Sequence, residues 1–245
     1  MRVTCVTSRY LPNLWHIVRV LSVDRAVILD LAPLPDRNRD SFVTRNRIWN
    51  ETALTPQWLT APVLRRRGQS VKDVQINPTE KRWVISHTHA LEHCYPRHEK
   101  IAPGFLANLQ SRLQGQASLL ELNLSVLRFL LEVLSPGSPF PYLESSILPS
   151  HGPNHRLEAA QFLRASQYVA GSVEWNLMTA SAQAQLFVDA GIEVIQSLAP
   201  VSHQHETDSI IYFSSVHCIC TRGVSATREL LERLVLMART SFVAD

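Results

Sequence analysis

The sequence predicts an α/β fold, with a mixed or mostly parallel sheet flanked by helices in a single compact domain over residues 1–245. Three observations lead to this prediction. Strand-like and helix-like stretches alternate along the chain. The run 25–30 is almost continuously apolar and ends in a carboxylate, as in a buried strand of a parallel sheet. No repeat, low-complexity segment or long linker divides the chain.

The first part of the chain is predicted to be rich in strands. Strands are expected at residues 2–7, 25–30, 57–64 and 71–76, with one short helix at 14–21. The first strand ends at the turn Leu11-Pro12-Asn13, because proline and asparagine favour turns. Residues 31–50 are predicted to form a loop.

The second part is predicted to be mainly helical. Helices are expected at residues 83–94, 103–113, 119–134, 156–165, 180–190 and 226–238, and strands at 141–144, 168–170 and 192–196. Helix 119–134 has the clearest pattern, because apolar residues fill most of its positions and Ser135-Pro136-Gly137 stops it. Gly191 is the expected cap after helix 180–190.

The composition is that of an ordinary soluble protein. Apolar residues make up 45% and charged residues 18%, which excludes disordered, collagen-like and coiled-coil classes. No apolar run approaches the roughly 20 residues that cross a bilayer, and the N-terminus does not resemble a signal peptide. We therefore expect a cytoplasmic protein without membrane insertion. The net charge of +3 is too small to indicate a nucleic-acid partner, and glycine-rich phosphate loops are absent, so no cofactor is predicted.

Seven of the ten histidines fall in two clusters, which raises the question of a metal site. The clusters are His87, His89, His93 and His98, and then His203, His205 and His217 with Glu206, Cys218 and Cys220. Two imidazoles four residues apart on a helix can grip one metal, and thiolates favour zinc. Because a third ligand of defined spacing and an H-E-x-x-H motif are both absent, we predict no metal site. A metal-dependent hydrolase remains an alternative.

Charged residues near strand ends are candidates for substrate binding. Asp30 closes an apolar strand, and ligands of open α/β sheets bind beyond the carboxyl ends of the strands. Arg45, Asn46 and Arg47 are suited to a carboxylate or phosphate, because guanidinium groups pair bidentately with such anions. The alternative for these three residues is a solvated loop. Cys5 lies in a predicted buried strand, where a thiol usually serves as a small hydrophobe.

Six groups of residues follow one another in an order that is typical of a single family. They are Tyr10-Leu11-Pro12; Val27-Ile28-Leu29-Asp30; Ser41-Phe42 with Arg45-Asn46-Arg47-Ile48; Trp58 to Val63 with Lys72-Asp73-Val74; Trp83, His87 and Tyr95; and Leu122-Asn123, Ser145-Ser146, Arg156-Leu157, Gly171 and Gly191 to Val194. Together they resemble the WbqC-like family of small bacterial proteins from O-antigen and natural-product gene clusters. The similarity extends from Cys5 to about Gly223.

The chain departs from the family pattern mainly at its start. The family opens with H-Q-P-x-Y-x-P-W, whose histidine, glutamine, first proline and tryptophan are replaced by Val6, Thr7, Ser8 and Asn13. Leu31 stands where a second acidic residue is usual, and His217 where an aspartate is frequent. A catalytic role of the family's opening histidine would therefore be lost or taken over by another group.

The resemblance implies an acyl or aminoacyl (glycyl-type) transferase that acts on a sugar or carrier-bound intermediate in O-antigen or natural-product biosynthesis. Such chemistry needs a base for the acceptor proton and donors for the developing oxyanion. In this interpretation His87 is the base, and Asp30 orients it or binds the acceptor. Cys5 is an alternative, as a thioester-exchanging nucleophile.

Substrate binding is assigned in the same interpretation. The candidates are Tyr10, Arg45, Asn46, Arg47, Trp83 and Tyr95. Core packing is the alternative for the aromatic members. The partners implied are a small-molecule or carrier-bound acyl donor, an amine or hydroxyl acceptor, and a carrier protein. The alternative from another class is a non-catalytic accessory or binding protein, which the loss of the opening histidine would also produce.

Overall fold

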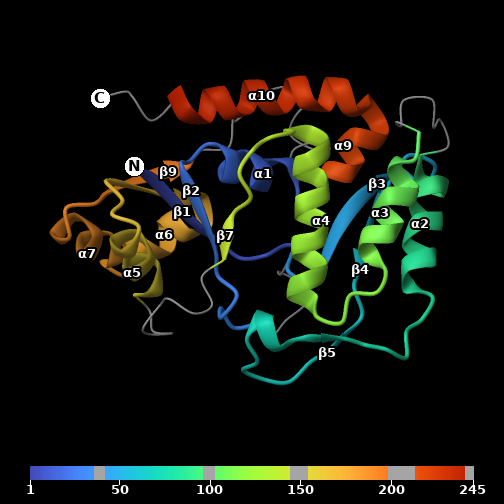
Figure 1. Cartoon of the computed structure of the whole chain (residues 1–245), viewed down its shortest axis with the longest axis horizontal. Helices are drawn as coiled ribbons and strands as arrows, with labels where there is room; N and C mark the ends of the chain where they lie inside the picture. The colour runs from blue at the N-terminus through green and yellow to red at the C-terminus, as the bar shows by residue number, and fades with distance from the viewer. Residues whose placement is uncertain (36–41, 96–102, 144–153, 198–212, 241–245) are drawn as a thin grey trace.

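A five-stranded sheet, parallel throughout, forms the centre of the structure (Figure 1). The structure is a computed structural model and describes residues 1–35, 42–95, 103–143, 154–197 and 213–240. The strand order is β7-β2-β1-β8-β9. The strands are β7 (Tyr142–Leu143), β2 (Arg25–Ile28), β1 (Arg2–Val6), β8 (Gln167–Gly171) and β9 (Glu193–Ser197). The α/β class and the mostly parallel sheet expected from the sequence are confirmed.

Helices cover both faces of this sheet, because its strands carry apolar side chains on both sides. Val3 and Cys5 of β1 pack toward α5 (His155–Phe162), α6 (Ser172–Ala180) and α7 (Gln183–Asp189). Val6 packs in the opposite core. That core is formed with α1 (Leu14–Leu21), α4 (Leu119–Leu134) and α10 (Val224–Thr240). In Figure 1, α5, α6 and α7 gather on one side of the sheet, while α4 and α10 lie on the other.

The strand order reverses direction between β1 and β8. After β1 the chain runs through α1 to β2 on one side, whereas after β8 it runs through α6 and α7 to β9 on the other side. The segments that leave the carboxyl ends of β1 and β8 therefore diverge. In open α/β sheets this switch point is where a crevice opens and ligands bind.

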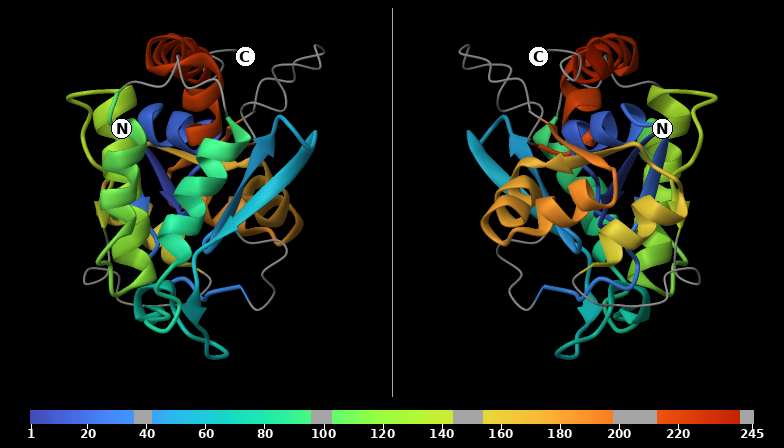
Figure 2. Two further views of the ribbon diagram at one scale, coloured as in Figure 1. Left: turned by 90° about the vertical axis from the view of Figure 1, so that its right-hand side faces the viewer. Right: turned by 90° about the vertical axis from the view of Figure 1, so that its left-hand side faces the viewer.

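A long insertion between β2 and β7 builds a second layer beside the sheet. It contains an antiparallel hairpin of β3 (Arg45–Asn50) and β4 (Thr55–Thr60), which Figure 2 shows apart from the main sheet. The hairpin is followed by β5 (Val63–Leu64), the 3-10 turn η2 (Val71–Asp73), β6 (Gln75–Ile76), α2 (Trp83–Cys94), α3 (Phe105–Leu113) and α4. The buried helix α9 (Ser215–Arg222) precedes α10.

Three of the expected helices occur at the expected bounds, namely 14–21, 83–94 and 119–134. The loop predicted for residues 31–50 is wrong over its last six residues, which form β3. This strand alternates half-buried arginines with the buried Asn46 and Ile48, so it lacks the apolar pattern of a strand. The strand expected at 57–64 is interrupted by Pro62, whose missing N–H cannot join a ladder.

Two further expectations are wrong for local reasons. The strand predicted at 71–76 begins as a 3-10 turn, because the Ser70 hydroxyl bonds the Asp73 carboxylate instead of leaving the backbone extended. Helices α6 and α9 were not predicted from the sequence. On α6, Val173 and Leu177 are exposed, while nearly every residue of α9 is buried, so neither helix shows an amphipathic stripe. No helix in the described ranges is both long and apolar enough to cross a membrane.

Candidate functional site

A cavity of about 500 Å³ opens at the switch point of the sheet. Its walls come from the chain that follows β1, from Leu29 after β2, from α1, and from Gly171 and the first turn of α6. The cavity thus lies beyond the carboxyl ends of parallel strands, where ligands of this architecture bind. Its volume falls in the range of small-molecule sites, roughly 300–1,000 Å³.

The segment after β1 forms one wall and is fixed by contacts from distant parts of the chain. Leu11 has a left-handed backbone (φ 43°), and its carbonyl accepts a hydrogen bond of 2.6 Å from Asn46 Nδ2. The Pro12 carbonyl accepts from both the backbone N–H and the hydroxyl of Ser215. Asn13 then caps α1, since its side chain accepts from His16 N at 2.9 Å. The wall is therefore held before any ligand arrives.

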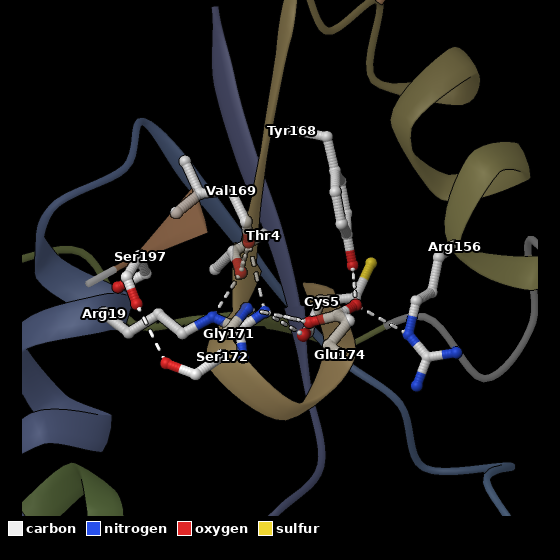
Figure 3. A network of polar contacts seen from close by, with 10 residues as sticks. All are labelled: Thr4, Cys5, Arg19, Arg156, Tyr168, Val169, Gly171, Ser172, Glu174 and Ser197. Atoms are coloured by element: carbon white, nitrogen blue, oxygen red, sulfur yellow. Dashed lines mark hydrogen bonds and ion pairs between the residues drawn. The ribbon is translucent and has the colours of Figure 1, made fainter. Parts of the chain in front are cut away.

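The opposite wall is organised around the carboxylate of Glu174 on α6 (Figure 3). Its Oε2 lies 2.5 Å from Arg19 Nη2, and its Oε1 lies 2.8 Å from Arg156 Nε. The Tyr168 hydroxyl donates to Oε1 at 2.5 Å, and the Gly171 N–H donates to Oε2 at 3.2 Å. One carboxylate therefore joins α1, α5, β8 and α6 at the cavity.

The pKa of Glu174 reflects this arrangement. Burial alone would raise it, but the charges of Arg19 and Arg156 and the Tyr168 hydroxyl outweigh burial and hold the pKa below its usual value. Arg19 is fixed in turn by the Thr4 hydroxyl, at 2.8 Å from Arg19 Nε, and by backbone carbonyls. The carboxylate and its two guanidinium partners thus neutralise one another in part.

Two other arginines at the cavity have no such partner. Arg9 lies over the ring of Phe42, with 5.6 Å between Cζ and the ring centroid. Arg47 lies over Phe213 at 5.2 Å and near Trp58 at 6.0 Å. Within the described ranges, neither guanidinium forms an ion pair with a carboxylate.

His16 is the imidazole of this cavity. It lies on the first turn of α1 and is only 4% exposed, and its Nε2 has no hydrogen-bond partner among the described residues. Burial lowers its pKa well below the usual value, and the charges of Arg9 and Arg19 lower it further. The ring is therefore neutral at pH 7, and the tautomer with an unprotonated Nε2 can accept a proton.

The sequence-predicted residues Tyr10, Trp83 and His87 come together, but not at this cavity. The Tyr10 hydroxyl lies 2.8 Å from His87 Nδ1, and the Trp83 ring packs edge-on against His87 with centroids 5.2 Å apart. Burial lowers the pKa of His87 to about 4. The three residues form a packed cluster between the segment after β1 and α2.

Tyr95 takes part in a second pair of the same kind. Its hydroxyl lies 2.7 Å from His217 Nδ1 and accepts the Trp49 N–H at 3.3 Å. Burial lowers the pKa of His217 to about 4 and raises that of Tyr95. This pair ties α9 to α2 and β3.

The remaining predicted residues are dispersed. Cys5 lines the cavity, but burial raises its pKa to about 12, with the Glu174 charge adding to the effect. Asp30 is buried just after β2 and does not line the cavity. Arg45 lies over Trp58 at 3.9 Å on β3, and Asn46 points the other way, to the Leu11 carbonyl. Of the residues predicted for the site, the structure places Cys5 and Arg47 at the cavity.

The two histidine clusters do not assemble a metal site in the part of the chain that the structure describes. No three His, Cys, Asp or Glu side chains there are grouped closely enough to hold a metal. His98, His203, His205 and Glu206 lie outside the described residues. Cys218 and Cys220 are buried in α9.

Sequence reasoning missed His16, Arg9, Arg19, Arg156 and Glu174 as parts of a site. One signal was available. Val6, Thr7 and Asn13, three positions at which the chain departs from the family's opening motif, all line the cavity.

Comparison with known proteins identifies the family of the chain. The model of the WbqC-like protein family matches residues 8–228, which is most of the 245-residue chain. No curated protein and no solved structure matches.

Proposed function

Because the chain belongs to the WbqC-like protein family, we propose that it is an acyl or aminoacyl transferase whose active site is the cavity at the switch point. The acceptor is an amine or hydroxyl of a sugar or carrier-bound intermediate. The observation that carries the proposal is that His16, whose buried Nε2 has no hydrogen-bond partner among the described residues, is one of the residues that line that cavity. The neutral imidazole can take the acceptor proton as the acceptor attacks, and its low pKa makes it a weak base that acts only together with that attack.

His16 replaces His87 as the base in this proposal. His87 is engaged with Tyr10 and does not line the cavity, whereas His16 does and has a nitrogen without a partner. Val6, where the family has its opening histidine, lines the same cavity as His16. Because both residues line one cavity, this location supports a role for His16 on α1 as the base in place of a histidine at position 6 of β1.

The reaction is then a direct transfer. The acceptor nitrogen or oxygen attacks the acyl carbonyl carbon while His16 Nε2 takes the acceptor proton. A tetrahedral oxyanion forms, the bond to the leaving sulfur or oxygen breaks, and the leaving group takes the proton from the His16 imidazolium. The high pKa of Cys5, about 12, supports a route without an acyl-cysteine intermediate, because a thiol without a base is a weak nucleophile.

The test is product formation by the full chain. Acyl and aminoacyl thioesters are incubated with amine and sugar acceptors, and products and intact protein are followed by mass spectrometry. We expect acylated acceptor and no acyl adduct on the protein. An adduct that is lost in Cys5→Ala would overturn direct transfer. Absence of product from every donor class, in a protein that still binds donor or acceptor, would favour the binding-protein alternative.

A further inference from the structure

We propose that one substrate of the cavity carries a phosphate group, and that Arg9 and Arg47 bind it. The inference deepens the proposed function, on which it rests, by naming the chemistry of a substrate of the same cavity. Phosphate is shared by two kinds of activated intermediate, nucleoside diphosphate conjugates and phosphopantetheine arms. The structure favours the shared group, and the experiment below separates the two sources.

The charges that line the cavity do not balance. Among the described residues, four arginines and one carboxylate line it, and Arg19 and Arg156 share that carboxylate. Arg9 and Arg47 are left as two positive charges that no carboxylate of the described chain neutralises. A polar cavity with this excess is suited to an anion.

Both guanidinium groups are partly desolvated, which makes an anion more favourable still. The Arg47 Nε is buried and has no hydrogen-bond partner in the part of the chain that the structure describes. Burial lowers the pKa of Arg9 to about 10, and the neighbouring Arg19 adds to the effect. A buried donor without a partner destabilises the folded chain, and a bound oxyanion would supply the missing acceptor.

The two side chains are also held in place without a ligand. Phe42 and Trp58 form an aromatic surface with ring centroids 6.0 Å apart, and Arg9 stacks on Phe42. Phe213 supports Arg47 from the other side. Because guanidinium groups that stack on aromatic rings lose less freedom on binding, such a pair is preorganised for an anion.

Phosphate suits this geometry better than carboxylate. One guanidinium fork satisfies the two oxygens of a carboxylate, whereas a phosphate offers three oxygens and up to two charges to two forks. Arg9 comes from the segment after β1 and Arg47 from β3, and both line the same cavity, so two forks from different elements are available to one ligand. The cavity, at about 500 Å³, also has room for the larger molecule to which such a phosphate would be attached.

The test is direct binding, measured by isothermal titration calorimetry on the full chain without an acceptor. The probes are inorganic pyrophosphate, uridine diphosphate, 4′-phosphopantetheine and succinate. We expect the phosphate probes to bind at 1:1 and succinate at least ten-fold more weakly. Tighter binding of uridine diphosphate than of 4′-phosphopantetheine indicates a nucleotide conjugate, and the reverse indicates a carrier arm; either order supports the inference.

The variants Arg9→Gln and Arg47→Gln should each weaken phosphate binding at least ten-fold. Arg128→Gln is the matched control, because Arg128 also stacks on an aromatic ring, Phe140 at 4.6 Å, but lies outside the cavity. Arg47→Lys, which keeps the charge, should recover part of the affinity. The inference is overturned if no phosphate probe binds, if succinate binds as tightly, or if both glutamine variants bind like the control. Turnover without phosphate binding would overturn this inference alone, and phosphate binding without turnover would overturn only the transferase.

Discussion

Replacing Glu174 with glutamine should destabilise the protein strongly, because the carboxylate balances two guanidinium groups inside the structure. The Glu174 side chain is 12% exposed and that of Arg19 is 13% exposed. Removing one partner of a buried pair leaves an uncompensated charge and typically costs 3–5 kcal/mol. Glutamine keeps the shape and part of the hydrogen bonding, so we expect a loss of about 3 kcal/mol in the free energy of unfolding. For a chain of this length that corresponds to roughly 6–12 °C in Tm.

The assay is urea unfolding followed by tryptophan fluorescence, with wild type, Glu174→Gln and a control. Glu132→Gln is the matched control, because Glu132 pairs with Arg112 at 3.1 Å but both side chains are largely exposed. An exposed pair contributes about 0–1 kcal/mol, so the control should unfold near the wild-type midpoint. A loss below about 1 kcal/mol in Glu174→Gln, equal to that of the control, would refute the charge-balance reasoning.

The pair of Glu174 and Arg19 also makes a prediction about coupling. Glu174→Gln alone leaves the Arg19 guanidinium without its carboxylate. The double variant Arg19→Met, Glu174→Gln removes that guanidinium as well, although Arg156 remains. We expect the double variant to lose less stability than the sum of the two single variants. Strict additivity would mean that the two side chains do not compensate each other.

Three further perturbations test other parts of the account. Asn46→Ala removes the side-chain amide that donates to the Leu11 carbonyl and should cost about 1–3 kcal/mol in urea unfolding, because that carbonyl loses this partner. His87 and His217 each have a pKa near 4 when folded against 6.5 when free, so their stabilisation is complete above about pH 6.5 and is lost as pH falls toward 4. At pH 5 this amounts to about 2 kcal/mol for each, and a variant with glutamine at both positions should show a correspondingly flatter stability profile between pH 7 and pH 5. Gly171→Ala places a Cβ 2.6 Å from Nη1 of Arg19. Because Thr4 and Glu174 hold this side chain in place, the replacement should cost about 1–3 kcal/mol by thermal unfolding.

A specific result would contradict each of these three predictions. A wild-type midpoint for Asn46→Ala would show that the hydrogen bond to the segment after β1 is replaced, for example by water. An unchanged pH profile in the glutamine variant would show that the two imidazoles are not held neutral in the folded chain. Gly171 has an ordinary backbone conformation (φ −71°), so backbone strain does not contribute to its replacement. A wild-type midpoint for Gly171→Ala would show that the Arg19 side chain moves aside and would remove the steric explanation.

The main sheet could be predicted from the sequence because its strands are apolar on both faces. The runs that form β1, β2 and β8 each place buried side chains in both helix layers, and such apolar runs are visible without knowledge of their partners. Strand β3 could not be predicted, because Asn46 is buried only through its bond to Leu11, 35 residues away. Residues 45–50 are a strand because they pair with β4, and the local sequence pattern does not encode that pairing.

The site was harder to predict for a related reason. Arg9, His16 and Glu174 meet at the cavity only because β1 and β8 are neighbours, and β8 lies more than 150 residues after β1 in the chain. Their individual positions follow no motif spacing. The sequence-predicted His87 does carry a perturbed pKa, but the perturbation comes from packing against Tyr10 and Trp83. His87, the histidine chosen from the first cluster, therefore lies in a packed interior, whereas His16, which belongs to neither cluster, lies at the cavity.

The most direct test of the central claim compares His16→Gln with His87→Gln in steady-state acyl transfer, with folding of both verified by unfolding curves. If His16 is the base, its replacement should lower kcat by about 10²- to 10⁴-fold with a folded protein, while His87→Gln retains most of the turnover. A His16→Gln variant that is folded and turns over at the wild-type rate would contradict the assignment of the switch-point cavity as the site of proton transfer.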